Sequence, residues 1–214
     1  MALAKTLDVF ADTSAACEYL AERHKPLARA VAAIGTPHIR RRPGGFEALF
    51  RIIIEQQVSV ASAQAIWRRC QDGIDQPTPQ NVLRLGEEKL RTFGLSRPKA
   101  HYVSQLAARI ETGDLDFDEI AKASDDAAAN ILQSIKGIGP WTAAIYLLFC
   151  EGRIDIWPPR DVALLGAYRA AQLRGPKADM ERLDKKAAQF APYRGIAAHI
   201  LWTYYAHIRG RTPI

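Results

Sequence analysis

The sequence predicts an all-α protein, and three observations support this fold class. Apolar residues recur at i, i+3 and i+4 spacing through most of the 214 residues, as on one face of a helix. No segment alternates apolar and polar residues as a half-buried strand does, and we find no internal repeat or low-complexity stretch. Ser or Thr precedes several periodic segments, where its hydroxyl can cap a helix N-terminus.

Composition limits the function classes. A chain of 214 residues can bury a core as one domain or two small ones, and 48% hydrophobic with 24% charged residues is ordinary for a globular protein. The net charge of +6 and the pI near 9.3 favour an anionic partner, and nucleic acid is the first candidate.

The cysteines and the apolar segments indicate the compartment. Cys17, Cys70 and Cys150 are far apart, so they form neither a metal-ligand cluster nor an even disulfide set. Met1–Phe10 lacks the apolar run of a secretion signal, and no stretch approaches the length of a membrane span. We expect a cytoplasmic protein, nucleoid-associated in a bacterium, with no metal, no membrane contact and no obligate protein partner.

The first half of the chain contains strongly periodic helices. We expect helices over 13–23, 26–34, 46–57, 60–70, 79–85, 87–92 and 97–111. The helix at 46–57 has almost no polar face and should lie deep in the core. Two basic features stay open: Arg40–Arg42 is either a solvated loop or a phosphate contact, and Arg97 with Lys99 in a first helical turn either bind an anion or are tolerated there.

The second half continues with short helices around a glycine-rich corner. We expect helices over 117–121, 124–134, 140–150, 161–171, 178–190 and 195–208. Between the second and third of these, Gly137 and Gly139 allow a tight hairpin, and Pro140 suits the first position of the next helix. The glycine amides and the free N–H groups of that helix can then bind a phosphate, with Lys136 at the rim. The alternative is a plain helical corner without a ligand.

Asp161 is the strongest candidate for chemistry. An Asp at a helix start is most often a cap for the N–H groups of the first turn. This one follows the rigid pair Pro158–Pro159 and comes one apolar helix and one connector after the hairpin. An anion-binding hairpin followed by such a carboxylate suggests a reaction on a nucleotide near a bound phosphate.

These motifs resemble a known family. Ile135-Lys136-Gly137-Ile138-Gly139-Pro140-Trp141-Thr142-Ala143, followed by Pro159-Arg160-Asp161, is similar to the helix-hairpin-helix superfamily of DNA glycosylases, and within it to the 3-methyladenine DNA glycosylase II branch. Residues 46–61 and Pro192-Tyr193-Arg194 resemble the same branch. The resemblance covers roughly residue 46 to the C-terminus.

The resemblance implies two helical lobes with a cleft between them. One lobe would be residues 46–153, and the other residues 1–45 plus 154–214, without the N-terminal sheet domain of some relatives. It also implies base flipping from duplex DNA that contains alkylated bases, with no cofactor beyond a possible monovalent cation at the hairpin.

The resemblance assigns roles to individual residues. Asp161 would be the catalytic carboxylate, and the hairpin would bind the DNA backbone through Lys136, Gly137, Ile138, Gly139 and Thr142. Gln57 would fill the gap left in the duplex. The base pocket would use Trp141 and Trp202, with Tyr146 and Tyr205 as weaker candidates. The alternative is that all four are core aromatics, and this alternative is stronger for the two tyrosines.

The implied activity is that of a monofunctional hydrolase. Bifunctional members carry a lysine nucleophile at the start of the second hairpin helix, and this sequence has Trp141 and its neighbours there. Iron–sulfur members carry four cysteines near the C-terminus, which this sequence lacks. Two alternatives stay open: a glycosylase for a deaminated or oxidised base, and a non-catalytic DNA-binding module.

Overall fold

The computed structural model describes residues 11–173 and 176–212, and these residues form helices without a β-sheet. The predicted all-α class is therefore confirmed for the described chain. By its contacts the chain divides into two compact units. We call residues 42–146 the hairpin unit, and the described parts of residues 11–41 and 147–212 the aspartate unit. The sequence placed these boundaries at 45/46 and 153/154. That the units face each other across a cleft stays a prediction.

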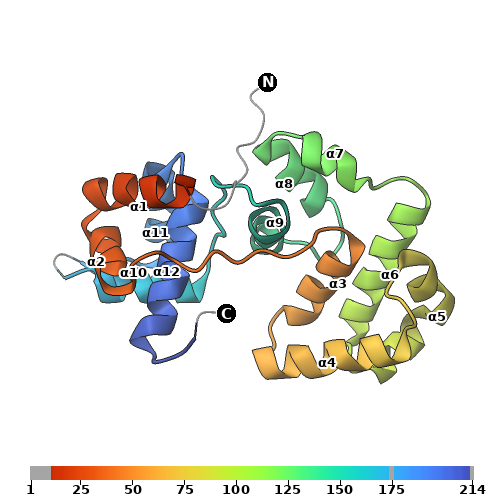
Figure 1. The fold of residues 1–214 in the computed structure, drawn as a ribbon. Helices are drawn as coiled ribbons and strands as arrows, with labels where there is room; N and C mark the ends of the chain where they lie inside the picture. The colour runs from red at the N-terminus through yellow and green to blue at the C-terminus, as the bar shows by residue number, and fades with distance from the viewer. Residues whose placement is uncertain (1–10, 174–175, 213–214) are drawn as a thin grey trace. The chain divides into compact units, whose positions relative to one another are not determined.

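The hairpin unit is built around one apolar helix. Its helices are α3 (Phe46–Glu55), α4 (Val60–Gly73), α5 (Pro79–Thr92), α6 (Arg97–Glu111), α7 (Phe117–Lys122), α8 (Asp125–Gln133) and α9 (Pro140–Tyr146). Because α3 is apolar on nearly every side, it is buried, and it packs against α4, α6 and α9 (Figure 1). Ser59, Thr78, Ser96 and Ser124 cap α4, α5, α6 and α8. Gly86 has a φ of 75° and kinks α5 where the sequence predicted two helices.

The aspartate unit is built around the last helix. It contains α1 (Ala11–Arg23), α2 (Lys25–Ile34), a π-helical turn η1 (Leu147–Glu151), α10 (Val162–Ala171), α11 (Met180–Ala187), a 3₁₀ turn η2 (Ala188–Phe190) and α12 (Arg194–Ile208). Helix α12, blue in Figure 1, packs against α1, α2 and α10. The expected α-helix over 140–150 is wrong in its second half, because the backbone widens into η1 at Leu147.

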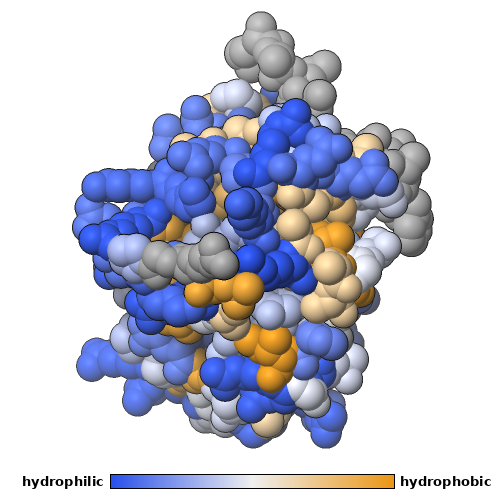
Figure 2. Space-filling view, turned by 90° about the vertical axis from the view of Figure 1, so that its left-hand side faces the viewer, coloured by the Kyte–Doolittle hydropathy of each residue, from blue (hydrophilic) through white to orange (hydrophobic). Residues whose placement is uncertain are grey.

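The surface is mainly polar. On the face drawn in Figure 2, hydrophilic side chains predominate and hydrophobic ones form small separate patches. Among the described residues, no helix is both long and apolar enough to cross a membrane.

Candidate active site and DNA-contact residues

Asp161 caps helix α10 and also contacts an aromatic side chain. Its Oδ1 accepts hydrogen bonds from the N–H groups of Ala163 (2.8 Å) and Leu164 (2.9 Å). Trp202 donates its indole Nε1–H to the other oxygen, Oδ2, at 3.4 Å. The carboxyl group is half-buried. One oxygen therefore serves the helix while the second is oriented by Trp202, so the capping interpretation and the catalytic one are compatible.

A second acid, Asp184 of α11, holds the turn that leads to Asp161. Its Oδ1 accepts the indole N–H of Trp157 at 2.9 Å. The main-chain N–H of Arg160 is 3.1 Å from Oδ2 and 3.3 Å from Oδ1. Arg160 has a φ of 58°, a conformation that a non-glycine residue rarely adopts. Asp184 thus fixes both ends of the turn 157–160.

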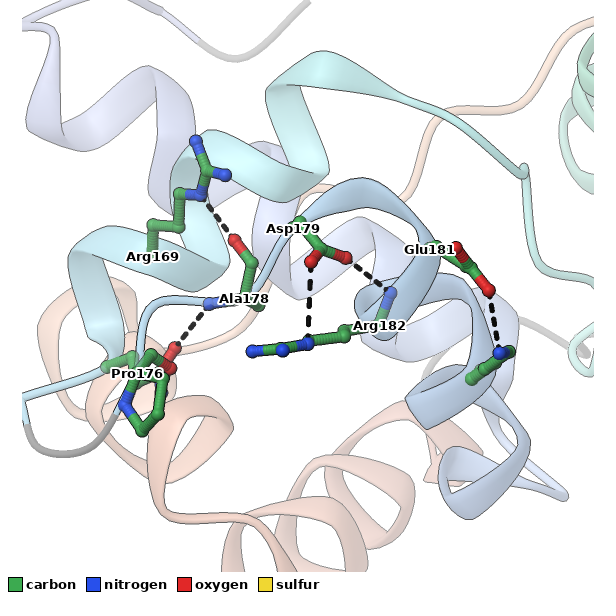
Figure 3. A network of polar contacts seen from close by, with 8 residues as sticks. Arg169, Pro176, Ala178, Asp179, Glu181 and Arg182 are labelled. Carbon is green, nitrogen blue, oxygen red and sulfur yellow. Dashed lines mark hydrogen bonds and ion pairs between the residues drawn. The ribbon is translucent and has the colours of Figure 1, made fainter.

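Helix α11, which carries Asp184, is itself anchored at its start. Arg169 of α10 donates its Nε–H to the carbonyl oxygen of Ala178 (Figure 3). Asp179 caps α11 by accepting the N–H of Arg182 at 2.8 Å, and it also forms an ion pair with the Arg182 guanidinium at 3.4 Å (Figure 3). The position of Asp184 relative to α10 therefore follows from contacts at the beginning of its helix.

Trp202 belongs to an aromatic cluster within the aspartate unit. Its ring centroid is 5.5 Å from that of Phe149 and 5.7 Å from that of His199, both edge-on. Burial, together with the nearby charges of His38, Arg40 and Arg41, lowers the pKa of His199 to about 3. His199 is consequently neutral at physiological pH and acts as a packing partner of Trp202.

The two tyrosines are already engaged. Tyr146 is 2% exposed, and its hydroxyl accepts the N–H of Gly45 at 2.9 Å. The guanidinium of Arg209 lies 4.5 Å from the ring centroid of Tyr205. Tyr146 is therefore a core residue, and the ring of Tyr205 already has a cation–π partner. We leave both tyrosines out of the proposed pocket. Trp141, in the first turn of α9, is half-buried.

The hairpin has the predicted glycine geometry at Gly137. Gly137 has a φ of 89°, and a Cβ there would collide with the ring of Tyr102. Gly139 has no such constraint; its carbonyl accepts the N–H of Ala143 at 2.9 Å as α9 begins. Lys136 and Gly139 are exposed, whereas Ile138 is 4% exposed. A ligand can thus reach the main chain and Lys136, while the Ile138 side chain fastens the hairpin to its unit.

Gln56, which precedes the expected wedge residue, ties α3 to the hairpin. Its Nε2 donates to the carbonyl oxygen of Gly137 at 3.0 Å and to Oγ1 of Thr142 at 3.1 Å. Thr142 is 4% exposed, so its hydroxyl serves this internal contact. The loop after α3 and the hairpin are therefore held together as one surface within the hairpin unit.

Lys99 of α6 caps the C-terminal end of α3. Its Nζ donates to the carbonyl oxygens of Ile54 (2.8 Å) and Gln56 (2.6 Å). Burial lowers its pKa. The interpretation of Lys99 as an anion ligand is therefore wrong, because its ammonium group binds the last carbonyls of a helix. Between these anchors, Gln57 has a φ of 54° and an exposed side chain.

The arginine run is not a freely solvated loop. Arg42 pairs with Glu55 at 3.3 Å in the hairpin unit. In the aspartate unit, the guanidinium of Arg40 is 5.0 Å from the Phe149 centroid, and Arg41 donates to the carbonyl oxygen of Cys150 at 3.5 Å. Each of the three side chains has a partner in its own unit.

Sequence reasoning missed the residues that position the candidates. Asp184 and Tyr102 act from helices distant in sequence, and no local motif marks them; Lys99 was noticed, but not its contact with the end of α3. Gln56 directly precedes the expected wedge residue Gln57, and nothing in the sequence marks which of these two glutamines faces the hairpin. Within residues 11–173 and 176–212, no three His, Cys, Asp or Glu side chains come together as a metal site.

Known proteins share both sequence and fold with this chain. The alkylbase DNA glycosidase-like protein mag2 of Schizosaccharomyces pombe is 31% identical over 174 residues, which cover 78% of this chain and 80% of that protein. The 3-methyladenine DNA glycosylase Mag1 of the same yeast, solved in complex with abasic DNA, superposes with a TM-score of 0.79 at 26% identity and covers 88% of this chain and 95% of its own. A DNA-3-methyladenine glycosidase structure from Bacillus halodurans gives 0.78 at 27% identity, covering 98% and 96%.

The family assignment rests on a region that contains the hairpin and the two acids described above. The model of the HhH-GPD superfamily of base excision DNA repair proteins matches residues 50–192, which include the hairpin, Asp161 and Asp184. This chain belongs to the HhH-GPD superfamily of base excision DNA repair proteins.

Proposed function

We propose that this chain is a monofunctional DNA glycosylase that hydrolyses the N-glycosidic bond of alkylated bases, of the 3-methyladenine type, in duplex DNA. The observation that carries the proposal is Asp161, whose Oδ2 is oriented by Trp202 while its Oδ1 fixes the helix start. The similarity to proteins named as alkylbase and 3-methyladenine glycosylases supports the substrate class.

The reaction needs a carboxylate at the sugar. As the C1′–N bond breaks, positive charge develops on the sugar and the base leaves with the bonding electrons. The Asp161 carboxylate would stabilise this charge and accept a proton from the water that adds to C1′. An alkylated purine is already cationic, so it leaves without strong acid assistance.

The base pocket would use tryptophan faces. A cationic base gains about 0.5–2 kcal/mol from each electron-rich face that it contacts. Trp202, next to Asp161, and Trp141, half-buried at the start of α9, are the residues that we propose for this role. Helix α9 has no lysine, so a Schiff base with the sugar and the resulting strand cleavage are not expected.

The hairpin unit would hold the DNA backbone. The main-chain N–H groups of Gly137 and exposed Gly139 would bind a phosphate, and Lys136 adds a charge; the N–H of Ile138 already donates to the carbonyl oxygen of Ile135. A monovalent cation could share the hairpin carbonyls, although that of Gly137 already accepts a bond from Gln56. Gln57 would enter the duplex in place of the extruded nucleotide. The partner is duplex DNA, and we propose that in a bacterium the protein lies in the cytoplasm, at the nucleoid.

The direct test is release of bases from DNA treated with a methylating agent, by the parent chain and by Asp161→Asn. Asn is as good a helix cap as Asp, so the α10 start should survive while the charge is lost. We expect base release to fall by about 10²–10³ or more, and affinity for duplex DNA to stay within a few-fold.

Three other outcomes would contradict parts of the proposal. Equal activity in Asp161→Asn would remove the catalytic role of this residue. Release of hypoxanthine or oxidised guanine, but not of methylated purines, would favour a glycosylase for another lesion. DNA binding without release of any base would favour a binding module.

A further inference from the structure

Two residues of the described chain combine a non-glycine side chain with a positive φ, and they lie one in each unit. Gln57 has a φ of 54° and Arg160 a φ of 58°. Residues in this region are disfavoured unless surrounding contacts hold them, and such residues concentrate at functional sites. Gln57 already has a proposed role in the duplex, whereas Arg160 has none.

The surroundings of the two residues match. The carbonyl oxygen of Gln56, before Gln57, accepts a bond from Lys99, and the N–H of Arg160 is held by Asp184. Each residue is exposed and has an exposed valine close by in sequence: Val58 is 38% exposed, and Val162 is 75% exposed. In both places, contacts to the main chain turn a long polar side chain and a valine toward solvent.

We propose that Arg160 is a DNA-contact residue that binds a backbone phosphate beside the nucleotide on which Asp161 acts. This inference rests on the proposed function. Arg160 directly precedes Asp161, so its side chain starts next to the carboxylate. Among the described residues, its bonds to Asp184 come from the main-chain N–H, which leaves the guanidinium available.

Charge decides which part of the DNA Arg160 contacts. A guanidinium would repel a cationic base, so it does not belong in the pocket. It matches a phosphate, to which its planar fork can donate two parallel hydrogen bonds. Gln57 and Arg160 would thus contact different parts of the DNA. The neutral amide of Gln57 suits the interior of the duplex, and the cation of Arg160 suits its backbone.

The test uses a duplex with a tetrahydrofuran abasic-site analogue, titrated by fluorescence anisotropy over a range of salt concentrations. Arg160→Ala should weaken binding several-fold at low salt and reduce the slope of log K against log salt by about 0.9, the value for one phosphate contact. Arg160→Lys should keep most of the slope, because the charge remains. In base release, KM should rise while kcat stays within about twofold of the parent.

Arg160→Gly separates the side chain from the backbone. Glycine adopts a φ of 58° without strain, so the melting temperature should stay or rise while DNA affinity falls as in Arg160→Ala. Arg182→Ala is the matched control, because Arg182 is an exposed arginine of the same unit whose guanidinium pairs with Asp179.

The results distinguish failure of this inference from failure of the proposed function. If the parent releases methylated bases but Arg160→Ala and Arg160→Gly bind DNA like Arg182→Ala, the phosphate contact is refuted and the glycosylase stands. If the parent releases no base, the proposed function fails. If the salt slope of the parent still falls in Arg160→Ala, the contact of Arg160 with DNA stands without the glycosylase activity.

Discussion

The two units carry very different charge. Residues 42–146, the hairpin unit, contain 12 lysines and arginines against 13 aspartates and glutamates. The rest of the chain contains 17 against 10, so the whole excess of +6 comes from the segments of the aspartate unit. We propose that the hairpin contacts DNA, yet the unit that contains it has no excess of basic residues.

The difference indicates two ways of attracting a polyanion. In the hairpin unit the groups that we propose for phosphate binding are main-chain amides, whose geometry is fixed by Gly137 and by the bond from Gln56. In the aspartate unit we propose that side-chain cations attract the DNA, and such attraction acts over a longer range and is screened by salt. We therefore expect variants of the hairpin to change affinity at all salt concentrations, and cation variants of the aspartate unit to change mainly the salt dependence.

The sharpest way to test this comparison is the pair Gly137→Ala and Gly139→Ala. Alanine at Gly137 is strained at a φ of 89° and pushes its Cβ into Tyr102, at a cost of about 1–3 kcal/mol. We expect a lower melting temperature and about tenfold weaker binding to an abasic duplex, which is about 1.4 kcal/mol. The salt slope should change little, because no side-chain charge is removed.

Gly139→Ala is the matched control for the fold. No atom lies within 4 Å of its added Cβ, and its φ is not positive, so stability should be preserved. Any loss of affinity in this variant would report the methyl group meeting the DNA.

If Gly137→Ala binds DNA as well as the parent does, the hairpin amides are not the main contact of this unit.

A second test concerns His199, a buried histidine of the aspartate unit. Because the pKa of His199 is about 3 in the folded chain, against 6.5 when exposed, the unfolded chain binds more protons between these values. Stability from this residue is complete above pH 6.5 and declines as the pH falls, by about 1 kcal/mol at pH 5.5. Denaturant unfolding at pH 7.5 and 5.5 measures the difference. The pKa of His24 is also lowered by burial, so it adds a loss of the same sign.

Two variants isolate the contribution of His199. His199→Asn should lower stability overall but flatten its decline between pH 7.5 and 5.5, because the titrating group is gone. His207→Gln, on the exposed end of α12, should leave the decline as in the parent. An equally steep decline in His199→Asn would assign the pH dependence to other groups.

The sequence predicted the elements that depend on local chemistry. Ser96 and Ser124 cap helices as expected, Pro140 begins α9, and Asp161 caps α10. Helix α6 has the bounds that its periodicity indicated. These features follow from a few neighbouring residues, so a single sequence is sufficient to find them.

The sequence did not predict contacts made across the fold. The sequence left open whether Lys99 binds an anion or is only tolerated in a first helical turn, and its partners are in fact the carbonyls at the end of α3. Asp184 has no local motif, and its role depends on the distant turn at 157–160. The π-helical turn after Tyr146 was missed as well, since nothing in an apolar run marks where a helix widens.

The smallest effect that we expect comes from Trp202→Phe. Phenylalanine keeps the packing against Phe149 and His199 but removes the N–H that lies 3.4 Å from Oδ2 of Asp161. A hydrogen bond this long is weak, so we expect kcat for base release to fall about two- to fivefold with little change in KM. Because phenylalanine also offers a poorer face to a cation, the fall should be larger for methylated purines than for hypoxanthine. If both substrates are affected equally, Trp202 only orients Asp161 and does not contact the base. If neither is affected, Trp202 is a packing residue of the aspartate unit without a role in the reaction.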